Sequence, residues 1–139
     1  MQLHYEVDGE DFLRAGEASA AVKRVLKQLG ISGEIVRKVA IAMYEAEMNM
    51  VIHGKGGEID VVLTSEYVEI VLKDEGPGIP DIALAMKEGY STAPAHIREL
   101  GFGAGMGLPN IKKYSDELNI TSKWGKGTTV RIKVLLMPK

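Results

Sequence analysis

A two-residue alternation of apolar and polar positions recurs along this chain and predicts β-strands. It predicts five strands, at residues 3–7, 58–64, 67–74, 119–123 and 128–136. In the first, Leu3, Tyr5 and Val7 alternate with polar residues, as expected for a strand with one buried face. Only Ser65 and Glu66 separate the second strand from the third, which is short enough for a hairpin.

A period of three to four residues predicts helices between these strands. The expected helices cover residues 11–29, 32–52, 81–87 and 106–118. Val22, Leu26 and Leu29 share the expected buried side of the first helix. Gly30 stands where a C-cap glycine belongs, and Ser32 has the chemistry of an N-cap for the second helix.

The order of these elements indicates the fold class. It is β-α-α-β-β-(α)-loop-α-β-β, with a long aperiodic loop at 88–104 that is rich in Gly, Ser, Thr, Pro and Ala. Because the strands arrive in adjacent pairs, we expect a largely antiparallel or mixed sheet with the helices on one face. The prediction is an α+β, two-layer sandwich forming a single domain over residues 1–139.

Composition and charge exclude several classes of protein. The chain is 45% hydrophobic and 26% charged with a net charge of −2, so neither a disordered chain nor a basic nucleic-acid or membrane surface is expected. It has no cysteine, which excludes disulfides, thiolate nucleophiles and cysteine-ligated metals. The N-terminal segment has no apolar stretch typical of a signal peptide, so the expected location is the cytoplasm.

Glycine is over-represented, with 16 of 139 residues, against a typical usage of about 7%. The familiar glycine motifs for phosphate are absent: no Gly-Lys pair precedes Ser or Thr, and no G-x-G-x-x-G occurs. The catalytic-loop H-R-D of protein kinases is missing too. A nucleotide site in this chain must therefore use another architecture.

The second predicted helix carries the first group of candidate residues. Glu45, Asn49 and His53 are spaced by four residues and share one stripe of the helix. A carboxylate can accept a proton from a hydroxyl or water, and an amide carbonyl is a hard oxygen ligand suited to Mg²⁺. The alternative is a polar, solvent-facing stripe without chemistry.

The second group follows the strand at 67–74. Asp74 shares a face with the apolar residues of that strand, so its carboxylate needs a partner, and an adenine amine is a donor of the right kind. Gly76 and Gly78 would let the backbone approach a flat base. The alternative is an ordinary turn after a strand. Thr128 also points inward, toward either a backbone partner or a ligand.

The third group is a run of alternating glycines, Gly101, Gly103, Gly105 and Gly107, leading into the last predicted helix. Free backbone N–H groups next to a helix N-terminus form an anion site. The alternative is a flexible linker.

Together, these sites resemble the motifs of the GHKL (Bergerat-fold) ATPases. Glu45-x-x-x-Asn49 is similar to the N-box, Asp74-x-Gly76-x-Gly78 to the first glycine box, and the glycine run and Gly127-Thr128 to the second and third. Within the superfamily the chain looks like the small bacterial anti-sigma regulatory serine/threonine kinases. It most resembles the RsbT-type switch kinases of stressosomes, and less closely the RsbW and SpoIIAB anti-sigma factors.

The resemblance implies a MgATP-dependent kinase acting on Ser or Thr of a STAS-domain partner. Glu45 would be the general base and Asn49 the Mg²⁺ ligand, with Asp74 bound to the adenine amine. Implied nucleotide contacts are Asn49, His53, Asp74, Gly76, Gly78, Gly101, Gly103, Gly105, Met106, Gly107, Leu108 and Thr128. His53 would serve either as a phosphate-side contact or as a structural residue at the helix end. The loop at 88–104 would be an ATP lid.

Some assignments stay open at this point. Glu47 could compete with Glu45 as the base, but it points about 200° away on the helix. Lys87 and Arg98 are candidate cations for the γ-phosphate, with solvated surface charges as the alternative.

Three functions compete. The first is the kinase. The second is a nucleotide-gated binding protein that sequesters a sigma factor or activates a PP2C-type phosphatase. The third, an isolated ATPase domain of a sensor histidine kinase, is disfavoured because the chain begins with its own strand.

Overall fold

A computed structural model describes residues 1–9, 15–52, 56–74, 76, 107–123 and 126–136. Its strands are β1 (Gln2–Asp8), β2 (Gly56–Leu63), β3 (Tyr67–Asp74), β4 (Glu117–Lys123) and β5 (Gly127–Leu135). Its helices are α1 (Glu17–Gln28), α2 (Gly33–Ile52) and α5 (Gly107–Tyr114). None of the helices in this part of the chain is both long and apolar enough to cross a membrane. The expected helix at 81–87 and lid at 88–104 lie outside the described residues.

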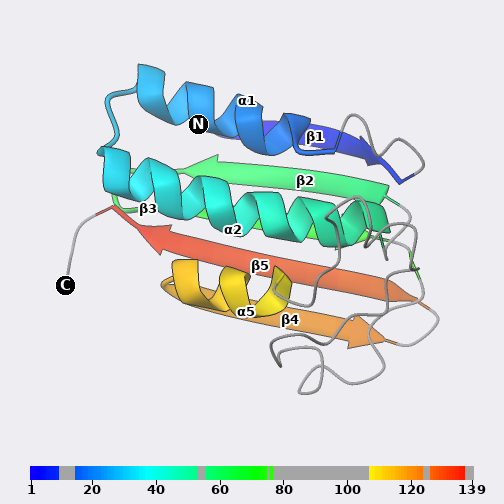
Figure 1. Ribbon diagram of the computed structural model, residues 1–139. Coiled ribbons are helices and arrows are strands. Elements are labelled where there is room, and N and C mark those ends of the chain that lie inside the picture. Colours follow the sequence, from blue (N-terminus) through cyan, green and yellow to red (C-terminus); the bar gives the residue numbers. More distant parts are fainter. Residues whose placement is uncertain (10–14, 53–55, 75, 77–106, 124–125, 137–139) are drawn as a thin grey trace.

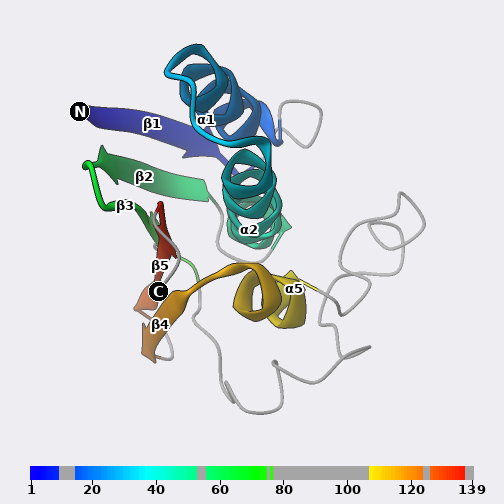
Figure 2. The ribbon, with the colours of Figure 1, turned by 90° about the vertical axis from the view of Figure 1, so that its left-hand side faces the viewer.

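The five strands form one sheet in the order β1-β2-β3-β5-β4, and each neighbouring pair is antiparallel. The three helices lie side by side over one face of this sheet, with α2 between α1 and α5 (Figure 1). Figure 2 shows the same two layers along the strands. The predicted α+β sandwich with helices on one face is therefore confirmed.

The core fills the space between the three helices and the sheet. The helices contribute side chains at the helical period and the strands contribute every second residue, as the patterns predicted. The largest fully buried apolar side chains include Leu26, Met43, Ile59, Ile70, Leu72, Ile111 and Ile132. Because α2 contacts both α1 and α5 as well as the sheet, the helix itself is held in place from several sides.

The first helix is shorter than predicted. Residues 15 and 16 form a turn, and α1 begins at Glu17 rather than near residue 11. Gly16 has φ +94, a left-handed conformation that interrupts a helix. Leu29, expected on the buried side, caps the C-terminus of α1 and is 48% exposed. Both differences arise at the helix ends, where local caps override the apolar period.

The predicted caps between α1 and α2 are confirmed. Gly30 adopts φ +78, its N–H bonds to the Lys27 carbonyl, and the Ile31 N–H bonds to the Leu26 carbonyl. This is the pair of bonds of a Schellman motif, which satisfies carbonyls at the end of a helix. Ser32 Oγ accepts the Ile35 N–H at 3.4 Å, as an N-cap does.

The last helix also ends sooner than predicted. The expected helix reached residue 118, but α5 ends at Tyr114 and Leu118 lies in β4, opposite Ile132. Asp116 explains the change of direction. Its N–H bonds to the Lys133 carbonyl at 2.9 Å, and its Oδ2 accepts the Leu135 N–H at 2.7 Å. These bonds to β5 direct the chain from α5 into the sheet. They join residues that are distant in the sequence, so the apolar period of the helix could not predict them.

Candidate functional site

One end of the sheet gathers the termini of elements that are distant in the sequence. The C-terminal end of α2, the end of β3 and the starts of β5 and α5 all lie at the same end of the molecule (Figure 1). The pairing agrees, since Gly57 at the start of β2 lies opposite Asp74 at the end of β3, and Lys73 lies opposite Thr129 near the start of β5. Asp74, Thr128 and the start of α5 at Gly107 therefore lie at this end, and the stripe of Glu45 and Asn49 follows α2 toward it.

Glu45 lies where α2 faces α5. It is partly buried, as is Asn49 one turn further along the same stripe. Burial raises the pKa of the Glu45 carboxyl, and a hydrogen bond with the Asn110 side chain opposes part of that rise. A carboxyl with a raised pKa, partly open to solvent, is suited to accept a proton from a substrate hydroxyl.

Glu47 has a different environment, although it is two residues away. It is 2% exposed, and it accepts hydrogen bonds from the N-terminal end of α1. Its Oε2 accepts the N–H groups of Gly16 at 2.8 Å and Ala18 at 3.3 Å, and its Oε1 accepts the N–H and Oγ–H of Ser19 at 2.9 and 2.7 Å. Glu47 is thus a helix cap supplied from another element, and both of its carboxylate oxygens accept hydrogen bonds from the start of α1.

Asp74 faces the helix layer, as the strand period predicted. Val68, Ile70 and Leu72 on the same face are buried. Its Oδ1 accepts the N–H of Gly76 at 3.0 Å and of Thr128 at 3.2 Å. Burial raises the pKa of Asp74, and these two N–H bonds oppose that rise. Because both bonds use Oδ1, neither of them occupies Oδ2.

Thr128 connects the ends of three strands. Thr128 is 8% exposed, and its N–H donates to Asp74 Oδ1 on the neighbouring strand β3. Its Oγ1 lies 3.0 Å from Ser122 Oγ on β4, so the hydroxyl predicted to need a partner has one. Gly76 is buried, and its N–H joins it to this group through Asp74 Oδ1.

Several predicted nucleotide residues lie outside the described part of the chain: His53, Gly78, Gly101, Gly103, Gly105 and Met106, together with Lys87 and Arg98. Gly107 and Leu108 form the start of α5. From the predicted set, the structure joins Asp74, Gly76 and Thr128 by hydrogen bonds. Glu45 and Asn49 lie on α2, whose C-terminal end is at the same end of the sheet.

Sequence reasoning missed two residues of this group, Asn110 and Ser122. Asn110 contacts Glu45 only because α5 packs on α2, and a short sequence window contains no such signal. The role of Glu47 could have been found. It follows Met43 by four residues and precedes Met50 by three, both buried, so it lies on the core-facing stripe. A carboxylate there requires donors.

A cavity of about 560 Å³ lies beside this end of α2, between β1 and α1. Its lining includes Tyr5, Arg24, Glu47 and Val51. Of the predicted nucleotide residues that the structure describes, none lines it, so it is separate from the candidate site.

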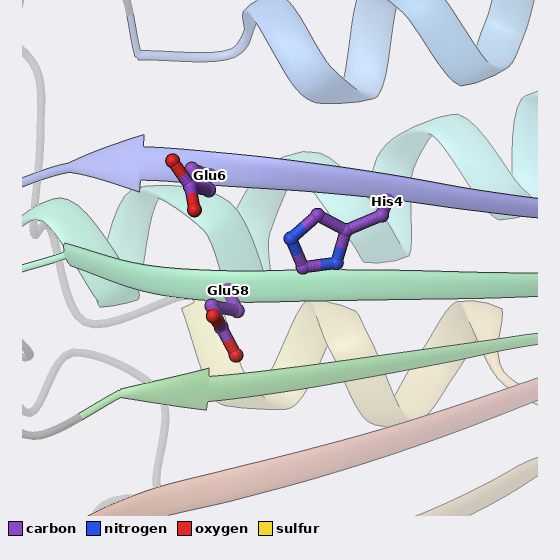
Figure 3. Close-up of side chains that lie close together, drawn as sticks. All are labelled: His4, Glu6 and Glu58. Atoms are coloured by element: carbon purple, nitrogen blue, oxygen red, sulfur yellow. The ribbon is translucent and has the colours of Figure 1, made fainter.

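A second group of ionisable side chains lies on the other face of the sheet. His4, Glu6 and Glu58 have their polar atoms within 4.8 Å of one another, and all are exposed (Figure 3). His4 Nδ1 lies 2.7 Å from Asp60 Oδ1, and this bond raises the pKa of His4. The group lies on the face away from the helices, so it is no part of the candidate site.

The sequence matches the family described as histidine kinase-like ATPase domain over residues 12–134. The chain belongs to the histidine kinase-like ATPases. This confirms the predicted resemblance to the GHKL ATPases.

The names of similar proteins indicate which members of this family the chain resembles. Serine/threonine-protein kinase RsbT of Bacillus subtilis (strain 168) is 30% identical over 113 residues, covering 78% of this chain and 79% of the relative. Anti-sigma F factor of Thermoanaerobacter sp. (strain X514) is 32% identical over 139 residues, covering 95% and 90%. The names of these relatives agree with the predicted class, a small serine/threonine kinase of the anti-sigma regulatory type.

Two solved structures support the fold. The SiaB–SiaC complex from Pseudomonas aeruginosa contains a chain with TM-score 0.68 and 13% identity, covering 95% of this chain and 88% of that one. The structure of the RsbU and RsbW domains of a Mycobacterium tuberculosis protein gives TM-score 0.66 and 18% identity, covering 96% and 32%.

Proposed function

We propose that this protein transfers the γ-phosphoryl group of MgATP to a serine or threonine of a STAS-domain partner that controls a sigma factor or a stress response. The partner class rests on the resemblance to switch kinases, and the names of the kinase and anti-sigma relatives support it.

The observation that supports this proposal best is the division of roles between Glu45 and Glu47. Glu47 is fully used as a helix cap, whereas Glu45 is partly exposed with a raised pKa. Glu45 accepts the proton of the partner hydroxyl as that oxygen attacks the γ-phosphorus, the bond to the β-phosphate oxygen breaks, and ADP leaves.

The residues at this end of the sheet fit ATP and Mg²⁺. Asp74 lies on the helix-facing side of β3 with its Oδ1 bonded to the Thr128 N–H, and a carboxylate oxygen is a suitable acceptor for the exocyclic amine of adenine. Asn49 lies one helical turn from Glu45 and offers a hard carbonyl oxygen of the kind Mg²⁺ takes alongside water and phosphate. When bound, Mg²⁺ neutralises charge on the phosphates during transfer.

The direct test uses the whole chain with radiolabelled MgATP and each STAS-domain protein encoded in the same genome. The expected result is one partner labelled on a single serine or threonine, with no labelling when that residue is changed to alanine. Failure to label any STAS-domain protein, while the chain still binds ATP, would contradict the kinase assignment.

A second candidate function is supported by the relatives named anti-sigma F factor. In it, bound nucleotide changes the affinity for a sigma factor or a PP2C-type phosphatase, and Glu45 is not needed. Pull-down experiments with and without ATP separate the two functions. Partner binding that depends on nucleotide, with no phosphoryl transfer to any partner, favours this second function.

A further inference from the structure

Two neighbouring strands place three side chains of the metal-binding type together on the face of the sheet away from the helices. β1 and β2 are antiparallel, and their register sets Glu6 directly opposite Glu58 and His4 directly opposite Asp60. Since residues two positions apart share a face of a strand, all four lie on the same face. The donor atoms of His4, Glu6 and Glu58 lie within 4.8 Å of one another (Figure 3). One nitrogen donor and two oxygen donors are therefore gathered at one place on the sheet.

The hydrogen bond between His4 and Asp60 determines which ring nitrogen can bind a metal ion. His4 Nδ1 lies 2.7 Å from Asp60 Oδ1, and an ionised carboxylate can only accept, so Nδ1 carries the hydrogen. In the neutral ring the lone pair is then on Nε2. Figure 3 shows the outer edge of the ring, which carries Nε2, turned toward the two glutamates. A histidine that donates its other ring N–H to a carboxylate is the usual arrangement of a metal-binding histidine.

The two glutamates lack a cation between them. Like charges directly opposite each other on neighbouring strands destabilise a sheet, and Glu6 and Glu58 face each other in this way. The register sets Lys73 of β3 beside Glu58, but in the part of the chain that the structure describes no ion pair joins the two. A divalent cation bound by both carboxylates removes this repulsion.

We propose that His4, Glu6 and Glu58 bind a Zn²⁺ ion on the outer face of the sheet, through His4 Nε2 and one carboxylate oxygen of each glutamate, with Asp60 as the positioning residue for the His4 ring. Zn²⁺ fits this donor set because it binds both imidazole nitrogen and carboxylate oxygen, whereas Mg²⁺ prefers oxygen ligands. Three protein ligands leave the fourth position of the ion to water. The proposal is independent of the proposed kinase function.

The spacing of the donors is compatible with this ion. Zn–N and Zn–O bonds of about 2.0–2.2 Å set two ligand atoms of a tetrahedral site about 3.4 Å apart. The donors lie within 4.8 Å of one another, and both glutamates are exposed, so rotation of their side chains can close the difference. Because β1 is the outermost strand on its side of the sheet, the bound ion joins this strand to β2 and stabilises the fold.

The first test titrates ZnCl₂ into the whole chain by calorimetry, after treatment with a chelator and without nucleotide. His4→Gln and Glu6→Gln should each weaken Zn²⁺ binding by at least about tenfold. Glu66→Gln removes an exposed carboxylate in the turn at the other end of β2, and this matched control should leave the affinity unchanged. Equal affinity in the unchanged protein, His4→Gln and Glu6→Gln would overturn the proposal, and so would the absence of Zn²⁺ binding to the unchanged protein.

Nitrogen-15 NMR of the histidine rings identifies the ligand atom and tests the role of Asp60. Zn²⁺ should shift the Nε2 signal of His4 and leave Nδ1 protonated. Asp60→Ala should weaken Zn²⁺ binding by about tenfold and populate the second tautomer of His4 in the metal-free chain. Asp60→Asn, whose amide oxygen can accept the same bond, should restore most of both properties. Binding of the ion to Nδ1 would contradict the assigned roles of His4 and Asp60.

Thermal unfolding supplies a readout with two opposite signs. Glu6→Gln removes one of two facing charges, so without metal this variant should have a higher Tm than the unchanged protein. Added Zn²⁺ should raise the Tm of the unchanged protein and have a smaller effect on the variant. An equal rise of Tm in the two proteins would place the ion at other residues and refute the site.

Discussion

Glu45 and Glu47 show how two identical side chains on one helix acquire different properties. At 100° per residue they point about 200° apart, so one meets α5 and the other meets the start of α1. Four donors surround the Glu47 carboxylate, whereas Glu45 has a raised pKa and part of its surface open. Environment, rather than residue type, separates the carboxylate that caps α1 from the carboxylate with the raised pKa.

Glu47→Gln should destabilise the fold by about 3 kcal/mol, because the new amide group would face backbone N–H groups that then lack an acceptor. Urea unfolding followed by circular dichroism measures this loss. Glu34→Gln removes one charge from the exposed first turn of α2 and should cost under about 1 kcal/mol. Equal effects of the two changes would show that Glu47 has no capping role.

At the scale of elements, the apolar and polar pattern predicts the strands and the centres of the helices well, but it predicts the ends of the helices poorly. The strands and the centres of the helices follow from apolar periods, because burial alternates as the sequence does. The start of α1 and the end of α5 do not follow from these periods. The start of α1 depends on Glu47, about 30 residues away in the sequence, and the end of α5 depends on bonds from Asp116 to a strand about 20 residues further on. Local propensity contains no information on such partners.

The same limit applies to the candidate site. Asp74 and Thr128 could be placed on the inner face of the sheet because a strand has a fixed period of two. Glu45 and Asn49 could be placed on one stripe for the same reason in a helix. Asn110 and Ser122 join the site through packing between elements, and only the structure reveals them.

The C-terminus of α1 provides a test at this scale. Gly30→Ala should destabilise the fold by about 1 kcal/mol, because φ +78 is strained for a residue with a Cβ. Gly33→Ala, at the start of α2, meets open space and should be neutral or stabilising by about 0.5 kcal/mol. Thermal unfolding of the two variants measures the contrast, and a Gly30→Ala variant as stable as Gly33→Ala would contradict the Schellman cap.

For the whole molecule, the site couples stability to pH through Asp74. Because its pKa is raised in the folded state, the fold binds this proton more tightly than the unfolded chain does. The contribution of Asp74 to stability therefore falls as pH rises from the unfolded pKa, about 3.9, through the folded pKa, and is constant above it.

Asp74→Asn removes this titration, while the amide oxygen can still accept the Gly76 and Thr128 N–H groups. The variant should gain stability relative to the unchanged protein as pH rises from 3 to 7 in urea unfolding. It should also lose at least about tenfold in ATP affinity, measured by calorimetry, because a bond to the adenine amine is lost. A variant that binds ATP normally would place the adenine elsewhere.

The central claim is that this end of the sheet is a phosphoryl-transfer site with Glu45 as its base. Single-turnover transfer from MgATP to the STAS-domain partner tests it most directly, comparing Glu45→Gln with Glu47→Gln at a temperature where both are folded. We expect Glu45→Gln to lose about 100-fold or more in the transfer rate with ATP affinity unchanged, and Glu47→Gln to lose under about tenfold. A Glu45→Gln variant that transfers phosphate at the rate of the unchanged protein would contradict the account.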